Sequence, residues 1–116
     1  MADRETLLAL ADRVEREPPS RELDGVIAAA VGIACFVPGE TPWGVHKYRA
    51  APAYTSSIDA AVTLVPKDSG MRVGGGHWGA WASIAGDAPA RARTYAAALC
   101  AAALRARAAM METQDA

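Results

Sequence analysis

The sequence predicts an α+β fold in which a small antiparallel sheet of about three strands is sandwiched between helices, with a long C-terminal helix. Two observations carry this prediction. Apolar residues recur at helical spacing in the N-terminal segment and again towards the C-terminus, where alanine dominates. Between these segments, β-branched and aromatic residues are interrupted by glycine and proline, which is typical of short strands joined by turns.

Length and composition favour one domain, residues 1–116, which is expected to begin with a helix over residues 1–17. Hydrophobic residues make up 52% of the chain and charged residues 22%, which is too apolar for a disordered chain and too charged for a membrane protein. The formal net charge of −1 argues against a broadly basic nucleic-acid-binding protein.

The chain is expected to begin with two amphipathic helices. Asp3 is the expected N-cap of the first, over residues 3–17, and two consecutive prolines end it. Ser20 is expected to cap the second helix, which ends near Gly32 and carries acidic residues in its first turn, where they favour the helix dipole.

A strand is expected near residues 43–49, because aromatic and β-branched residues lie there between proline and glycine turns. A short helix follows. Ser56 and Asp59 have nearly the spacing of a capping box at its start, and Pro66 ends it.

Two antiparallel strands are expected next, over residues 71–73 and 77–84, with the glycines 74–76 as a loose turn between them. Asp87 is then the expected cap of the last and longest helix, from residue 89 to about residue 111. Its many alanines predict close packing against a neighbouring element.

Metal binding and catalysis are not indicated by the sequence. His46 and His77 have no cysteine or carboxylate at a recognised metal-ligand spacing, and no Gly-x-Ser-x-Gly nucleophile motif is present. Cys35 and Cys100 lie in apolar segments and are expected to be buried free thiols. We therefore expect a non-enzymatic protein without a cofactor or a bound metal.

The expected location is the cytoplasm. The N-terminus carries acids where a secretory signal needs basic residues. No apolar run approaches the roughly 18 residues of a membrane span, so no membrane partner is expected.

Aromatic and basic residues gather in the expected strand region, and they supply the candidate site. The candidate ligand- or partner-binding residues are Trp43, His46, Lys47, Arg49, Tyr54, Arg72, His77 and Trp78. Aromatic rings beside arginine and histidine suit the stacking and anion recognition of a nucleotide, and equally a protein interface. The alternative interpretation is that Trp78 and Trp81 only cover a small sheet.

The run PAYTSSIDAAVTLVP, residues 52–66, precedes a glycine turn, a Trp-bearing strand and the alanine-rich helix. This order resembles small phage and prophage proteins described as having a phage ABA-sandwich domain, which are distantly similar to the NinX-like proteins of lambdoid phages. The likeness covers residues 20–108, with its specific part at residues 54–66. It implies helices on both sides of a small sheet, a phage or prophage origin and no established catalytic residues. Residues 33–53 are longer than the usual pattern, and any specialised binding is expected there.

The expected function is that of a non-enzymatic phage accessory protein acting in the bacterial host cytoplasm against host defence. Its expected partner is a host defence protein, as for a CRISPR-type inhibitor, or a small nucleotide signal. A homodimer packed through the alanine-rich last helix is a further hypothesis.

Two alternative functions stay open. One is a nucleic-acid-binding accessory of phage recombination or replication, in which binding uses Arg91, Arg93, Arg105 and Arg107. The other is an enzyme acting on nucleotides, with His46 or His77 as the general base.

Overall fold

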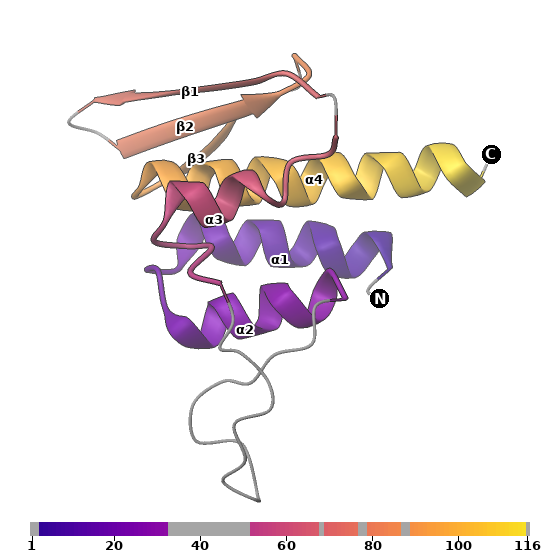
Figure 1. Cartoon of the computed structure of the whole chain (residues 1–116), viewed down its shortest axis with the longest axis horizontal. Coiled ribbons are helices and arrows are strands. Elements are labelled where there is room, and N and C mark those ends of the chain that lie inside the picture. The colour runs from indigo at the N-terminus through magenta and orange to yellow at the C-terminus, as the bar shows by residue number, and fades with distance from the viewer. Residues whose placement is uncertain (1–2, 33–51, 68, 77–78, 87–88, 116) are drawn as a thin grey trace, which may run out of the picture.

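The computed structural model describes residues 3–32, 52–67, 69–76, 79–86 and 89–115, with the backbone alone from residue 111 onwards. These residues form helices and one three-stranded sheet (Figure 1). The elements in chain order are α1 (Arg4–Arg16), α2 (Arg21–Ala30), α3 (Ile58–Val62), β1 (Met71–Gly76), β2 (Gly79–Ile84), β3 (Ala90–Ala92) and α4 (Tyr95–Asp115).

The two N-terminal helices form as predicted, because each has a side-chain cap at its start. The Asp3 carboxylate accepts a hydrogen bond from the Thr6 amide at 2.8 Å, and the Ser20 hydroxyl accepts one from the Leu23 amide at 3.0 Å. The apolar face of α1 is buried as expected, through Leu7, Leu10, Ala11 and Val14.

The starts of the two later helices differ from the prediction. The Ser57 hydroxyl caps α3, through the Ala60 amide at 3.4 Å, and Ser56 is exposed beside it. Helix α4 begins at Tyr95, where the Thr94 hydroxyl accepts a hydrogen bond from the Ala97 amide at 3.0 Å. The predicted start at residue 89 is wrong because residues 90–92 pair with β2 instead, and the predicted cap, Asp87, lies outside the described residues.

The sheet is antiparallel with the order β1-β2-β3. The predicted hairpin is present, but the glycines 74–76 continue β1 instead of forming the turn, since Gly74 pairs with Trp81 and Gly76 with Gly79. The third strand is β3. The strand expected over residues 43–49 lies outside the described residues.

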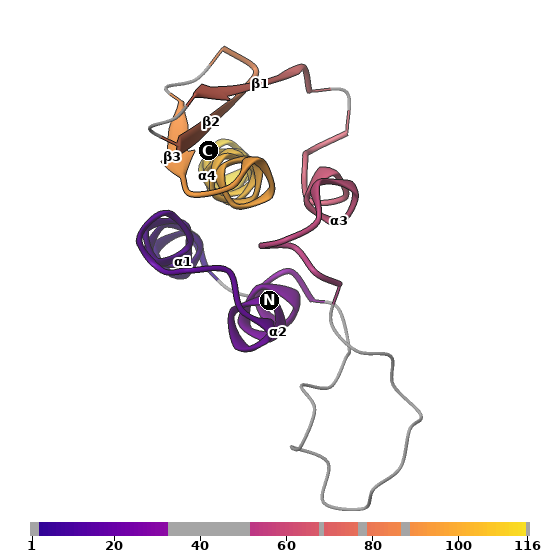
Figure 2. The same ribbon diagram turned by 90° about the vertical axis from the view of Figure 1, so that its left-hand side faces the viewer.

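The α+β class predicted from the sequence is confirmed: a three-stranded antiparallel sheet packs against helices, including the long C-terminal helix. Figures 1 and 2 show the order of the layers, with the sheet on α4, and α1 and α2 on the far side of α4. The described helices therefore cover one face of the sheet. The expected second helical layer, on the other face, is not formed by the residues that the structure describes.

Helix α4 lies at the centre of the core, and its alanine-rich composition explains how several elements can pack closely against it. It contacts the sheet, α1 and α3, so neighbours approach it from several sides. Alanine side chains are short enough to allow this close approach. Those that are buried are Ala96, Ala97, Ala98, Ala101, Ala102, Ala103, Ala106 and Ala108. These alanines of α4 therefore pack within the chain. Among the described residues, no helix is both long and apolar enough to cross a membrane.

Candidate binding surface on the outer face of the sheet

The structure separates the two predicted site residues that it describes. Tyr54 is fully buried in the core, next to the start of α3. Arg72 is exposed on β1. The other predicted site residues lie outside the described part of the chain; they are Trp43, His46, Lys47, Arg49, His77 and Trp78. Of the predicted site residues that the structure describes, Arg72 is therefore the one that can take part in a binding surface.

The face of the sheet turned away from α4 carries the residues around Arg72. Side chains alternate along β2, where Ala80, Ala82 and Ile84 are buried against the helices. Trp81 and Ser83 lie between them and point to the opposite, outer face. Strand pairing sets Arg72 opposite Ser83, and sets Trp81 between Gly74 and Arg91, so these residues share the outer face.

The Trp81 side chain packs so closely on Gly74 that no residue other than glycine would fit at position 74 without displacing it. A Cβ atom built on Gly74 would lie 2.6 to 2.8 Å from the indole atoms Cζ2, Cε2 and Nε1 of Trp81. The indole therefore lies across the backbone of β1 and remains partly exposed. Because residue 74 has no side chain, the ring can pack directly on the strand, next to Arg72.

A groove of about 490 Å³ opens along this surface at the end of β2. Its volume lies within the range of small-molecule sites, roughly 300 to 1,000 Å³. The residues that line it are Gly70, Met71, Arg72, Trp81, Ser83, Ala85, Gly86 and Pro89. They combine one cation, one hydroxyl and one aromatic ring with apolar and glycine residues, a set that suits an anionic ligand with a planar group.

The end of the groove is held by an uncommon backbone conformation. Ala85 has φ 55° and Gly86 has φ 80°, so both lie in the left-handed region, where alanine is strained. The Ala85 amide donates a hydrogen bond to the Gly70 carbonyl at 2.8 Å, which joins the two sides of the groove. Strained residues of this kind are concentrated at functional sites.

A separate ionic cluster joins α1 to α4 and β3. Arg105 forms an ion pair with Asp12 at 2.7 Å and a second one with Glu15, whose carboxylate also accepts the Arg91 amide at 2.8 Å. Partial burial opposes the ionisation of Glu15, but the hydrogen bonds from Arg105 and Arg91 outweigh it, so its pKa lies below the ordinary value. The cluster therefore holds α1 against α4 and β3, and we call these contacts of Asp12, Glu15, Arg91 and Arg105 the clasp.

This clasp also bears on the basic residues suggested for nucleic-acid binding. Arg105 is engaged by two carboxylates, and the guanidinium of Arg107 donates to the Leu64 carbonyl at 2.8 Å. Arg105 and Arg107 are thus both used within the chain. A phosphate backbone would have to compete with these contacts.

A buried polar network lies beneath α2 and is centred on Asp24, for which the sequence indicates only a favourable charge in the first helical turn. The Asp24 carboxylate is buried and accepts from both the amide and the hydroxyl of Thr55. Burial raises the pKa of the nearby Cys100 thiol to about 12, with a smaller contribution from the charge of Asp24. Cys100 is the buried free thiol expected there, protonated at neutral pH. Cys35 lies outside the described residues.

Trp81 belongs to the aromatic and basic region that suggests a site, but it is not among the site residues predicted from the sequence, where the alternative is that it covers the sheet. The signal was present in the alternation along residues 79–84, which sets Trp81 and Ser83 on the face opposite the alanines. In the described residues, no group of three or more histidine, cysteine or carboxylate side chains is placed to hold a metal ion.

Comparison of the chain with protein-family models, with curated proteins and with solved structures finds no match.

Proposed function

We propose that the chain is a non-enzymatic binding protein whose outer sheet face takes up a nucleotide-like ligand, an anion that carries a planar ring. In the setting that the phage resemblance implies, it acts in the host cytoplasm as a sponge for a nucleotide signal of host defence. The observation that carries the proposal is that Trp81 packs directly on Gly74, and that it lines the groove together with exposed Arg72.

The chemistry of the groove supports uptake of such a ligand. A ring stacked on a tryptophan contributes roughly 1 to 3 kcal/mol, as judged by alanine substitution. An arginine hydrogen-bonded to a phosphate contributes roughly 1.5 to 3 kcal/mol. Both groups come from paired strands of one sheet, so they are held at a fixed spacing, which lowers the entropy lost on binding.

The same groove offers little for turnover. None of the described residues that line it is a histidine, a cysteine or a carboxylate, the groups that most often act as general bases. No feature of the described residues favours a host protein as the partner, and the proposed ligand is therefore a nucleotide.

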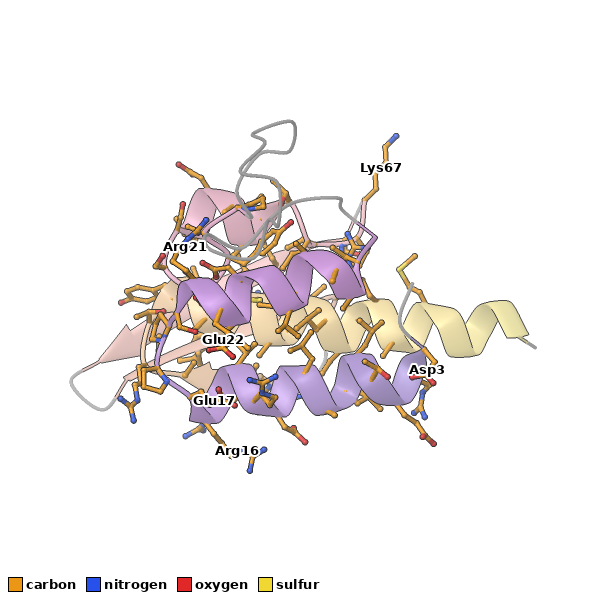
Figure 3. The ribbon with its side chains drawn as sticks, turned by 90° about the horizontal axis from the view of Figure 1, so that it is seen from below. Asp3, Arg16, Glu17, Arg21, Glu22 and Lys67 are labelled. Atoms are coloured by element: carbon orange, nitrogen blue, oxygen red, sulfur yellow. The ribbon has the colours of Figure 1, made fainter. Side chains whose placement is uncertain are left out.

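Isothermal titration of the full chain with mononucleotides and cyclic nucleotides tests the proposal. We expect a saturable heat with at least one of them, and Trp81→Leu and Arg72→Gln each to weaken binding at least about tenfold. Arg16→Gln is the matched control, because Arg16 is not among the residues that line the groove and its side chain extends outward from the end of α1 (Figure 3). Absence of heat with every nucleotide, or equal weakening in the control, contradicts the proposal.

Titration with single-stranded DNA separates the alternative function. Binding through phosphates weakens steeply as salt is raised, because counterions are released on binding. A steep salt dependence that Trp81→Leu leaves unchanged indicates nucleic-acid binding through arginines. Binding that is lost with Trp81 and depends weakly on salt supports the proposed ligand class.

A further inference from the structure

The two edges of the sheet differ in how their backbone groups are used. At the β3 edge, the Glu15 carboxylate from α1 accepts the Arg91 amide. At the β1 edge, no described strand pairs with the side of β1 away from β2. Edge strands left open in this way are templates for pairing with another chain.

The direction of the free groups follows from one hydrogen bond. The Gly70 carbonyl accepts the Ala85 amide at 2.8 Å, so the backbone of Gly70 faces β2. Backbone groups alternate along a strand, and Arg72 and Gly74 therefore also face β2. Met71, Val73 and Gly75 turn their amide and carbonyl groups to the open edge.

Strand β1 lacks the features by which proteins usually block an edge. It contains no proline, and its pairing with β2 runs without a bulge from Met71 to Gly76. Its apolar side chains are also poorly covered, since Met71 is 46% exposed and Val73 is 41% exposed. Arg72 is its one charged residue.

We propose that β1 pairs with β1 of a second copy of the chain, antiparallel, with Val73 next to the two-fold axis. A two-fold axis perpendicular to a continuous sheet requires one residue to lie opposite its own copy. A register centred on Arg72 would set two guanidinium groups opposite each other, and one centred on Gly74 would carry Met71 past the end of the partner strand. The register centred on Val73 avoids both.

In this register, the large side chains of one strand lie opposite glycines of the other. Met71 faces the partner's Gly75, and Arg72 faces the partner's Gly74, with Cα atoms about 4.5 to 5.5 Å apart. The partner's Gly74 is the residue on which the partner's Trp81 lies. Arg72 therefore reaches the edge of that indole, a cation–π contact that a partner of unrelated sequence would not supply.

This pairing argues for a second copy as the occupant of the edge, and it does not depend on any ligand. It replaces the alanine-rich helix as the dimer surface, since those alanines are buried within the chain. It also adds the partner's arginine to the surface around each Trp81.

Sedimentation equilibrium of the full chain, from micromolar to millimolar concentration, tests the proposal. We expect a concentration-dependent species of twice the 12.1 kDa protomer mass. Val73→Pro removes an amide that faces the open edge and leaves the bonds to β2 in place, so it is expected to give a monomer with unchanged circular dichroism. Val73→Thr, which keeps the amide, is the matched control and is expected to remain dimeric.

Two further variants keep the test decisive if the proline disturbs folding. Val73→Lys places two ammonium groups opposite each other and is expected to give a monomer. In a Cys35→Ser background, Val73→Cys is expected to form a disulfide-linked dimer on oxidation, whereas Met71→Cys is not, because Met71 lies far from its own copy. A monomer at all concentrations, or a dimer that survives both Val73→Pro and Val73→Lys, overturns the proposal.

Discussion

Thr55 donates both its backbone amide and its hydroxyl to the same oxygen of the Asp24 carboxylate, at 2.9 and 2.7 Å. Both residues are buried, and the other carboxylate oxygen accepts the Arg21 guanidinium at 2.9 Å. The Thr55 carbonyl in turn accepts the Thr94 hydroxyl at 3.3 Å. One threonine thus ties the turn before α3 to α2 on one side and to the start of α4 on the other.

Removing the Asp24 carboxylate is expected to be costly, because it leaves two buried donors of Thr55 without their acceptor. We expect Asp24→Ala to lower the free energy of unfolding by about 3 kcal/mol in urea denaturation. Asp24→Asn keeps an acceptor and loses only the ion pair with half-exposed Arg21, so we expect a loss of about 1 kcal/mol. Equal losses for the two variants would contradict this role of the carboxylate.

Gly74→Ala is expected to destabilise the fold by about 1 to 3 kcal/mol, because the new methyl group would displace the Trp81 indole. In a Trp81→Ala background the same change is expected to be neutral or stabilising, since alanine is better than glycine in a strand by about 0.5 to 1 kcal/mol. A double-mutant cycle from thermal melts measures the coupling. Gly70→Ala is the control, because no atom lies within 4 Å of its added Cβ. Additive effects at positions 74 and 81 would contradict the contact.

The parts of the fold that could be predicted from sequence are those fixed by local signals. Asp3 and Ser20 start their helices because a side chain and an amide three residues on are enough to form the cap. The start of α4 was missed because Pro89 after Asp87 is a local helix-start signal, whereas the pairing of residues 90–92 with β2 is a long-range contact. At residues 90–92, strand pairing therefore decides the structure in place of the local helix propensity.

The candidate surface was predictable only in part, for the same reason. Arg72 was singled out by its place in an aromatic and basic region, and it lies on the surface. Tyr54 was singled out for the same composition, yet it is buried, and composition does not tell which face a ring will occupy. Three consecutive glycines are a local signal for a turn, whereas the packing of Trp81 on Gly74 depends on the pairing of β1 with β2, which is a long-range contact.

Lowering the pH is expected to weaken the clasp between α1 and α4. The folded-state pKa of Glu15 lies below its ordinary value of 4.5, so its stabilisation is present above that value and is lost as the pH falls through the folded pKa. We expect Glu15→Gln to be less stable than the parent by about 1 kcal/mol at pH 7, and the gap to close towards pH 3.

Urea denaturation of both proteins across this pH range gives the measurement. The pKa values of Asp3 and Glu17 are also lowered, Asp3 mainly by its hydrogen bond with Thr6 and Glu17 mainly by its hydrogen bond with Arg13. Their contributions change in the same direction and cancel in the difference between the two proteins. A gap that stays constant from pH 7 to pH 3 would show that the ionised form of Glu15 is not what holds the clasp.

The left-handed turn at the end of the groove gives a prediction with opposite signs at adjacent positions. Ala85 at φ 55° carries a conformational cost that glycine does not, so Ala85→Gly is expected to raise the free energy of unfolding by about 0.5 to 1 kcal/mol. Gly86 at φ 80° has no atom within 4 Å of an added Cβ, so Gly86→Ala is expected to cost about 1 kcal/mol through conformation alone. Thermal melts of the two variants measure both effects. Changes of the same sign would show that packing or the unfolded chain, and not the backbone conformation, decides stability at this turn.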